Sequence, residues 1–366
     1  MTAPNSTDSR STGLNPAERS RTTAPAITSG RRAWAYARFF VGRFGGMLLV
    51  LLIIAVISYL IFYVLPSDPA QLSCGRPCTP DRLEQARAFM GYDEPWWRQF
   101  FTFLGGIVAG RTFGSGAAAV QCSAPCFGYS FRLNEPVTEL ILTRIPVTFS
   151  IAIGAAILWL ILGVSTGVIA ALKRGTVVDR TLTTISVAGV SAPSYLVGLL
   201  GIFIFGFTLN MVPVSGYVPF SQSPVDWLWH LILPWIMLAL LNAAIYTRLT
   251  RGQMLDVLGE DYIRTARAKG LKERRVIGRH ALRNVLIPVS TVFGLDLGGL
   301  LGGAVITEKV FSMQGLGSLL LDAVGNLDLQ VLVGVTLFSA FLIIIANFVV
   351  DVTYGLLDPR VKVIDS

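Results

Sequence analysis

Long apolar segments alternate with polar ones along almost the whole chain. Six of the apolar segments reach the roughly 20 residues that a helix needs to cross the hydrocarbon core of a bilayer. They lie at about 44–65, 146–172, 182–212, 231–249, 284–306 and 330–355. Glycine and proline inside these segments are compatible with membrane helices, because neighbouring helices satisfy the freed backbone groups. The pattern predicts an all-α polytopic membrane protein with six transmembrane helices, and the even number returns the C-terminus to the side of the N-terminus.

The polar segments divide the chain into four regions. Residues 1–33 are rich in Ser, Thr, Pro and Arg and have too little apolar surface to fold, which predicts a disordered cytoplasmic tail. Residues 34–65 form a cytoplasmic lead-in and a first span, which is retained because its apolar run starts too late and is too long for a signal peptide. Residues 66–145 form an extracytoplasmic loop region, and residues 146–362 form the transmembrane core with a cytoplasmic loop at 250–283.

The distribution of charge gives the direction of the chain in the membrane. The formal net charge is +8, and such an excess raises the question of a nucleic-acid partner. However, the Lys and Arg residues gather in the tail, between residues 173 and 180, at ten positions between Arg248 and Arg283, and near the C-terminus. These segments all fall on one side of the predicted membrane, which is the positive-inside bias. We therefore expect cytoplasmic termini, contact with membrane lipid and no nucleic-acid partner.

The four cysteines all lie in the predicted extracytoplasmic region, as Cys74-x3-Cys78 and Cys122-x3-Cys126. Two such pairs have enough thiolates for a tetrahedral metal. The region faces an oxidising compartment and Pro77 and Pro125 precede the second cysteine of each pair, so we favour disulfides over a metal site. Four cysteines allow three connectivities, and the sequence does not choose among them.

The stretch from Asp261 to Pro288 is a basic, polar island between two apolar segments. Ala266 and Gly270 are four residues apart, so on a helix they would lie one above the other and leave a shallow notch for another protein. Gly270 is also suited to end a helix, because glycine enters the left-handed conformation without a steric penalty. The island is predicted to be helix, sharp turn and helix, ending at Pro288.

Few residues are candidates for chemistry. Asp296 lies inside an apolar span, where it would either line a solute path or accept a hydrogen bond from a neighbouring helix. The glycine cluster that contains Gly299 and Gly303 would serve either close helix packing or a gate. With only His230 and His280, no histidine metal site is expected, and no phosphate-binding glycine loop is present. The chain is therefore not expected to be an enzyme or to hold a cofactor.

Asp261 to Leu271 together with Arg279 to Pro288 resemble the cytoplasmic Glu-Ala-Ala…Gly segment of the permease subunits of bacterial ABC importers. The long outer loop after the first span points to the first permease of the peptide/nickel branch. Supporting matches are Leu65–Pro69, Arg144–Thr148, Ser191–Tyr195, Gly298–Gly303, Thr307–Phe311, Gly315–Gly317 and Leu357–Arg360. Arg264 and Thr265 depart from the family pattern, which has Glu and Ala there, and Asp296 stands where a neutral polar residue is expected. The tail and the four cysteines are additions to that pattern.

The resemblance implies a type I ABC importer permease fold in the bacterial cytoplasmic (inner) membrane. It implies that the island couples to an ATPase subunit through Arg264, Thr265, Ala266, Gly270, Leu271 and Pro288. The implied partners are a second homologous permease, two ATP-binding subunits that hold ATP and Mg, and an extracytoplasmic solute-binding protein. Di- or oligopeptides are the implied solutes, with nickel chelates or another small solute as alternatives.

Two further classes of membrane protein stay open on the sequence alone. A stand-alone channel or secondary transporter would not need a docking island and would usually show more polar residues in the membrane or an internal repeat. A membrane scaffold protein would be stable without partners. Co-purification with a soluble ATPase separates both classes from an ABC permease.

Overall fold

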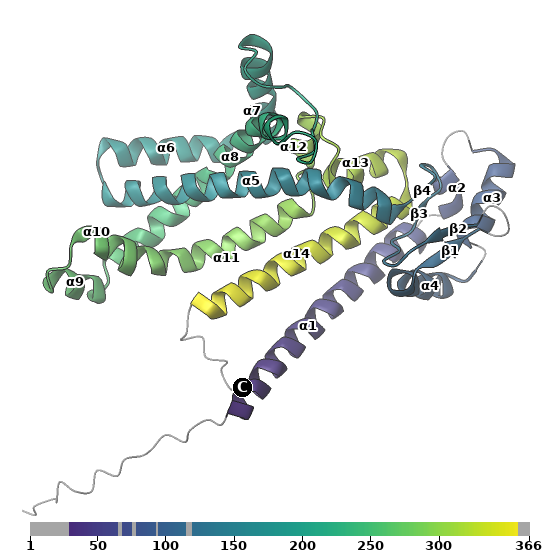
Figure 1. The fold of residues 1–366 in the computed structure, drawn as a ribbon, viewed down its shortest axis with the longest axis horizontal. Helices are drawn as coiled ribbons and strands as arrows, with labels where there is room; N and C mark the ends of the chain where they lie inside the picture. Colours follow the sequence, from purple (N-terminus) through teal and green to yellow (C-terminus); the bar gives the residue numbers. More distant parts are fainter. Residues whose placement is uncertain (1–28, 65–67, 75–77, 93, 115–118, 358–366) are drawn as a thin grey trace, which may run out of the picture. The chain divides into compact units, whose positions relative to one another are not determined.

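The computed structural model describes residues 29–64, 68–74, 78–92, 94–114 and 119–357 (Figure 1). The described residues fall into two units, a small one that ends at Phe44 and a large one that begins at Gly45. Helix α1 (Ser29–Tyr59) begins inside the predicted tail, so residues 29–33 are helical rather than disordered. The rest of that predicted tail lies outside the described residues.

Among the described residues, five helical segments are long and apolar enough to cross a membrane, and a bent pair makes a sixth if it counts as one span. The first is Val41–Tyr63, which takes in the end of α1 and most of the π-helical η2 (Leu60–Val64). The others are α5 (Val137–Leu172), α8 (Pro224–Leu258), the segment Glu273–Leu301 that ends in α11 (Leu282–Leu301), and the part of α14 (Leu329–Leu357) up to Val350.

The predicted third span is not a single helix. Helix α6 (Val177–Ser191) is followed by α7 (Ser194–Gly201) and η4 (Ile202–Thr208), and the two parts meet at an angle of 102°. The break falls at Pro193, which has no backbone N–H and forces the preceding Ala192 into an extended conformation with ψ of 129°. The span expected at 182–212 is therefore a bent pair of helices, a feature that hydropathy does not register because it averages over one proline.

The second and fourth spans were predicted too short. Helix α5 begins at Val137 rather than residue 146, and α8 covers Pro224–Leu258 rather than residues 231–249. A helix of 36 residues is about 54 Å long at 1.5 Å per residue, well above the roughly 30 Å of a hydrocarbon core. The extra turns are more polar than the rest of each helix, so a search for apolar segments misses them. Helix α8 begins at a cap, since the Ser223 hydroxyl accepts a hydrogen bond from the Asp226 N–H at 3.3 Å.

The predicted extracytoplasmic loop region is a small folded domain rather than a loop. It contains α2 (Pro69–Cys74), α3 (Pro80–Met90) and α4 (Trp96–Ala109). Two antiparallel pairs follow: β1 (Arg111–Phe113) with β2 (Val120–Cys122), and β3 (Tyr129–Ser130) with β4 (Glu135–Pro136). In the first pair Arg111 lies opposite Cys122. We call residues 68–136 the outer domain.

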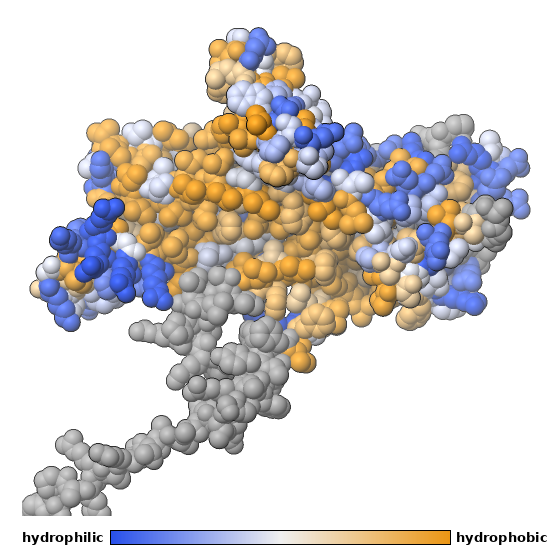
Figure 2. Space-filling model, in the orientation of Figure 1, coloured by the Kyte–Doolittle hydropathy of each residue, from blue (hydrophilic) through white to orange (hydrophobic). Residues whose placement is uncertain are grey.

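After α11 the chain forms two short helices, α12 (Val305–Val310) and α13 (Leu316–Asn326). Helix α13 is the longer of the two, with 11 residues. It returns to the outer domain, where the Arg132 guanidinium donates to the Asn326 carbonyl at 3.1 Å. On the molecular surface, a broad apolar band covers the long helices. Polar residues gather at the two ends of these helices (Figure 2).

The helix pair with the most extensive contact is α5 with α8, and α8 passes behind α5 in the view of Figure 1. A Cβ on Gly163 would lie 2.4 Å from the Tyr246 Cβ, and a Cβ on Gly167 would lie 2.7 Å from the Thr247 carbonyl oxygen. Such contacts exclude any side chain at these positions, so the glycines let the two backbones approach closely. Trp159 and Tyr246 are fully buried beside them.

Replacing Gly167 by alanine should loosen this pair. The new Cβ would meet backbone atoms of α8, which cannot move as a flexible side chain would, and overpacking of this kind typically costs about 1–3 kcal/mol. Gly252→Ala is the matched control on α8, since nothing lies within 4 Å of the added carbon. Thermal unfolding in detergent should show a lower midpoint for Gly167→Ala only, and equal midpoints for the two variants would contradict the packing described.

Candidate functional site: the coupling segment and the span that follows it

The basic island folds as helix α9 (Asp261–Ala268), a turn, the short α10 (Glu273–Arg275) and the π-helical η5 (Val276–Ala281), which leads directly into α11. We call residues 261–281 the coupling segment. Gly270 ends α9 with a φ of +75°. The Gly270 N–H donates to the Arg267 carbonyl at 2.9 Å and the Leu271 N–H to the Ala266 carbonyl at 3.3 Å. This pair of bonds is a Schellman cap, so the helix end predicted at Gly270 is confirmed.

The predicted notch between Ala266 and Gly270 is not present as an open surface. Ala266 is 7% exposed and packs in the main apolar core with Ile263 and Val276. Gly270 is exposed, and nothing lies within 4 Å of a Cβ placed on it. The spacing of four residues placed them on one face, but the Schellman turn carries Gly270 away from α9 while Ala266 turns inward. Small size at Ala266 therefore serves packing within this chain.

The outward face of the coupling segment is basic. Arg264 and Thr265 are exposed, and Arg267 pairs with Glu273 across the turn, with an Nη2 to Oε1 distance of 2.6 Å. Leu271 is half-buried and packs against the main core. A second link ties α9 to α11, because the Asn284 amide donates to the Tyr262 hydroxyl at 2.6 Å. The segment thus has a charged face that is free to contact a partner and an inner face bound to the membrane helices.

Pro288 does not end the second helix of the island. It lies inside α11, which continues to Leu301. A proline inside a helix removes one backbone hydrogen bond, but neighbouring helices and local π-helical turns make this tolerable in membrane proteins. The π-helical η5 stands just before this helix. The expectation that the island ends at Pro288 was therefore wrong.

Asp296 is the ionisable residue predicted within the fifth span. It is half-buried on α11, and its Oδ2 accepts a hydrogen bond from the Tyr246 hydroxyl of α8 at 2.8 Å. Of the two alternatives left open, the hydrogen bond to a neighbouring helix is thus present. This bond also joins the two helices that carry the ends of the coupling segment.

The glycines of the fifth span have separate roles. Gly299 is exposed and has open space beside it, whereas Gly298 packs against α14, where an added Cβ would lie 3.0 Å from the Ala346 Cβ. Gly303 has a φ of +137°, and its Cβ would lie 2.7 Å from the Gly317 Cα. Gly303 therefore allows a close backbone contact at the turn after α11, and only Gly299 faces open space.

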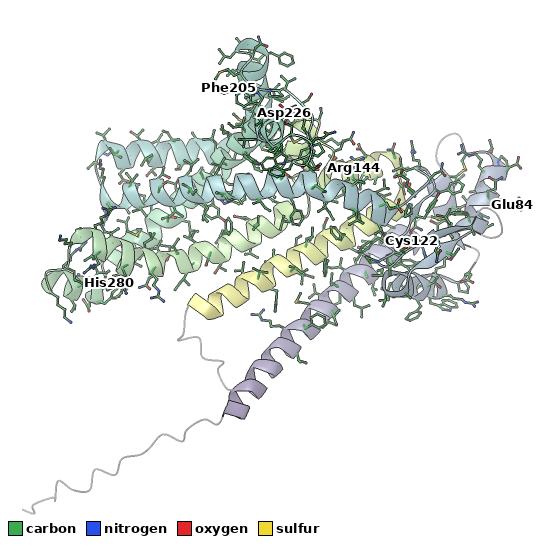
Figure 3. All side chains as sticks on the ribbon, in the orientation of Figure 1. Glu84, Cys122, Arg144, Phe205, Asp226 and His280 are labelled. Atoms are coloured by element: carbon green, nitrogen blue, oxygen red, sulfur yellow. A yellow bond between two sulfur atoms is a disulfide. The ribbon has the colours of Figure 1, made fainter. Side chains whose placement is uncertain are left out.

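The outer domain holds two disulfides, Cys74–Cys78 and Cys122–Cys126, with Cα atoms 5.6 Å apart in each. The connectivity that the sequence left open is thus within each pair. No group of three or more His, Cys, Asp or Glu residues suited to a metal ion occurs in the described part of the chain. Cys122 and His280 lie at opposite ends of the large unit (Figure 3).

Sequence reasoning missed three carboxylates that are buried in the described part of the chain, Asp179, Glu308 and Asp328. Asp179 on α6 is 4% exposed and forms a bidentate ion pair with Arg251 on α8. The Arg251 Nε donates to Oδ1 at 2.6 Å, and its Nη2 donates to Oδ2 at 2.9 Å. Glu308 on α12 is fully buried. Its Oε1 accepts from the Thr148 hydroxyl at 2.8 Å and the Ala304 N–H at 3.2 Å, and its Oε2 from the Ser318 N–H at 2.7 Å. In the sequence Asp179 is followed by Arg180 and Glu308 by Lys309, so neither stands out as an isolated charge in an apolar stretch.

Glu308 brings together α5, the turn after α11 and the start of α13. Burial raises the pKa of its carboxyl above the ordinary value, although the three donors oppose that shift. Gly315 is required beside it, because a Cβ there would lie 2.4 Å from the Glu308 Cδ. This gives a physical reason for the two motifs, Thr307–Phe311 and Gly315–Gly317, which the sequence presented only as resemblance.

Known proteins resemble this chain along nearly its whole length. Residues 163–363 match the family of binding-protein-dependent transport system inner membrane components. Residues 36–152 match the N-terminal region of the same kind of protein. The chain belongs to this family of inner membrane permeases.

Three relatives illustrate the similarity. A putative peptide transport system permease protein of Brucella abortus strain 2308 is 39% identical over 313 residues, covering 86% of this chain and 95% of the relative. The di/tripeptide transport system permease protein DppB of Pseudomonas aeruginosa strain UCBPP-PA14 is 36% identical, covering 88% and 98%. The dipeptide transport system permease protein DppB of Escherichia coli strain K12 is 35% identical, covering 89% and 98%.

Membership settles the broad expectations from the sequence. The chain is a permease subunit of an ABC importer with the fold of that family, and it is a non-catalytic, multi-pass protein of the inner membrane. A permease of this kind works in a complex with ATPase subunits and a solute-binding protein. A stand-alone channel, a secondary transporter and a scaffold are thereby set aside.

Replacing Glu308 by alanine should destabilise the outer end of the permease. The substitution leaves one hydroxyl and two backbone N–H groups buried without an acceptor, and each such group costs about 1–3 kcal/mol. Glu308→Gln keeps one acceptor oxygen and should lose less. Glu84→Ala, at an exposed acid of α3, is the control. If Glu308→Ala and Glu84→Ala unfold at the same temperature in detergent, the network does not hold these segments together.

Proposed function

We propose that the chain is one of two homologous permease subunits that together form a path for di- or oligopeptides. The observation that carries the solute class is the similarity to proteins named as peptide permeases, at 35–39% identity. It extends over 86–89% of this chain, so it includes the outer domain as well as the membrane core. Nickel chelates and other small solutes are the alternatives that the uptake experiment below distinguishes.

The basic end of the large unit faces the cytoplasm in this proposal, and so do both termini. Two observations support this direction. The basic residues of the coupling segment and the disulfides lie at opposite ends of the long helices (Figures 1 and 3). Disulfides persist in oxidising compartments, whereas Lys and Arg accumulate on the cytoplasmic side.

The coupling segment is the surface that contacts the ATPase subunits. There are two of these subunits, and each binds ATP with Mg. Its exposed face, with Arg264, Thr265 and Gly270, is free of contacts with the core. Its inner face is held by Ile263 and Ala266 in the main core. A force applied to the outward face therefore passes to α8 and α11 without loss in a flexible link, as rigid-body transmission requires.

A second permease and membrane lipid cover the apolar surface of α6, α7 and η4. Several large side chains on α7 and η4 are more than half exposed, among them Tyr195 at 55%, Leu199 at 51% and Phe203 at 62%. The 102° bend turns α7 away from the line of α6, so this surface extends beyond the α5–α8 pair. Apolar area of this extent requires either a protein partner or lipid. The solute-binding protein would dock on the outer domain, where Trp96 and Trp97 are about half-exposed.

Gly270→Val tests the coupling role. Valine at a φ of +75° meets a steric penalty of about 1–2 kcal/mol, which opens the Schellman turn and displaces Leu271. Uptake by the reconstituted complex should fall by roughly tenfold, within the usual range of coupling free energies, while ATP hydrolysis continues. Gly252→Val is the control, because Gly252 lies on α8 outside the coupling segment, is exposed, has nothing within 4 Å of its Cβ position and has no positive φ.

Gly270→Asn separates backbone strain from the loss of glycine itself. Asparagine tolerates the left-handed conformation better than valine does, so this variant should retain most of the uptake. Wild-type uptake and wild-type coupling in Gly270→Val would rule out this turn as the point of energy transfer.

Uptake identifies the solute class. A strain that lacks this permease should fail to accumulate radiolabelled di- and oligopeptides, and expression of the wild-type chain should restore accumulation. Labelled nickel with a chelator is the parallel arm. Restored nickel uptake without restored peptide uptake would reverse the assignment, and it would leave the family unchanged.

A further inference from the structure

Helix α4 of the outer domain carries two apolar stripes, each with the i, i+3, i+7 spacing of one helix face. The members of the first stripe are Phe100, Phe103 and Ile107. The members of the second stripe are Phe101, Leu104 and Val108. Each member of the second follows a member of the first by one residue, so the two stripes lie next to each other around the helix. A helix that packs on one neighbour needs only one such stripe.

The first stripe packs against the first span. Phe100 and Phe103 are buried, and the centres of their rings lie 5.2 Å and 6.2 Å from the centre of the Tyr59 ring. The Tyr59 hydroxyl also donates a hydrogen bond to the side-chain oxygen of Gln99 at 3.2 Å. These contacts fix α4 beside the end of the first span that adjoins the outer domain (Figure 1).

The second stripe is largely uncovered by the described part of the chain. Phe101 is 68% exposed and Val108 is 81% exposed, and Leu104 between them is half-buried. The exposed polar side chains of α4, Arg98 and Thr102, lie on the other side of the helix. A row of large apolar side chains on one exposed face, rimmed by polar residues, marks a surface that lipid or another protein covers.

The depth of α4 selects lipid as this cover. Tyr59 lies about one helical turn before the end of the first span. Ala55, a further turn inside the span, belongs to the same buried cluster as the first stripe. The second stripe is therefore level with the apolar end of the span, where Ile57 and Ile61 are themselves about half-exposed. Lipid lies at this level of a membrane protein, whereas a water-soluble partner stays outside it.

We propose that α4 is an interfacial helix whose second stripe enters the lipid around the end of the first span. In the orientation proposed above, this lipid is the outer leaflet. An interfacial helix has its apolar arc at the boundary of headgroups and acyl chains and its polar residues toward water, and Arg98 and Thr102 supply the polar side. The lipid contact concerns the later turns of α4, whereas the surface proposed for the solute-binding protein begins at Trp96 and Trp97. Its effect is to hold the outer domain against the membrane.

Spin labels on the second stripe test the lipid contact. All four cysteines of the chain are in disulfides, so Phe101→Cys and Val108→Cys each provide one free thiol for a nitroxide label. The labelled complex is reconstituted in phospholipid vesicles, and the unmodified complex treated in the same way gives the background from its other subunits. Power saturation should show both labels roughly threefold or more as accessible to oxygen, which concentrates in lipid, as to nickel ethylenediaminediacetate, which stays in water.

Two control positions should show the opposite preference. Thr102→Cys places the label on the polar side of the same helix, one residue from Phe101, and Glu84→Cys places it on the exposed side of α3. Both labels should be more accessible to the nickel complex than to oxygen.

Two results at Phe101→Cys and Val108→Cys overturn the proposal. Greater access of the nickel complex than of oxygen shows that the stripe lies in water, and the solute-binding protein is its occupant if its addition immobilises both labels. Low access of both reagents shows that another subunit covers the stripe. Two labelled positions keep the test available if one variant fails to assemble. The outcome depends neither on the solute nor on the coupling segment, so it is independent of the transport function proposed above.

Discussion

The close approach of α5 and α8 is the constraint on which the rest of the permease depends. Gly163 and Gly167 leave no room for a side chain of their own, so the backbones of α5 and α8 approach closely there. Side chains add to the contact, since the Thr166 and Thr247 hydroxyls share a hydrogen bond of 2.7 Å. Within a bilayer the hydrophobic effect does not drive helices together, and close van der Waals packing of small residues has to do so. Once α8 is fixed, it positions Tyr246 toward Asp296 on α11 and Arg251 toward Asp179 on α6.

The two ends of the membrane core are organised by different physical means. At the basic end, apolar residues of the coupling segment pack into the same core that continues between α5 and α8, so the segment moves with those helices. At the outer end, the buried Glu308 carboxylate collects donors from three separate parts of the chain. A buried carboxyl group with several hydrogen-bond donors permits little displacement, because each lost bond leaves a polar group unpaired. Each end is thus held by contacts that a displacement would break.

Sequence patterns determined some of these features and not others. Hydropathy located the membrane helices, because length and apolar character are local properties, and Gly270 was recognisable because left-handed geometry favours glycine. The bend at Pro193 was missed since a window average dilutes one residue. Ala266 was misjudged because helical spacing gives a face but does not say what covers it. Glu308 depends on Thr148, which is 160 positions away, and no local pattern contains such a contact. The pairing of the cysteines likewise required the fold.

The Tyr246–Asp296 bond has a consequence for how α8 and α11 move. Both helices adjoin the coupling segment, one before it and one after it, so a rigid displacement of that segment carries their adjacent ends together. Farther along, this hydrogen bond at 2.8 Å joins them again within the apolar region. Separating the two helices there would leave a carboxyl group and a hydroxyl group unpaired, at a cost of several kcal/mol in a medium with few alternative partners. The helices are therefore expected to shift as a pair, and the change in the path to arise where this pair meets other helices.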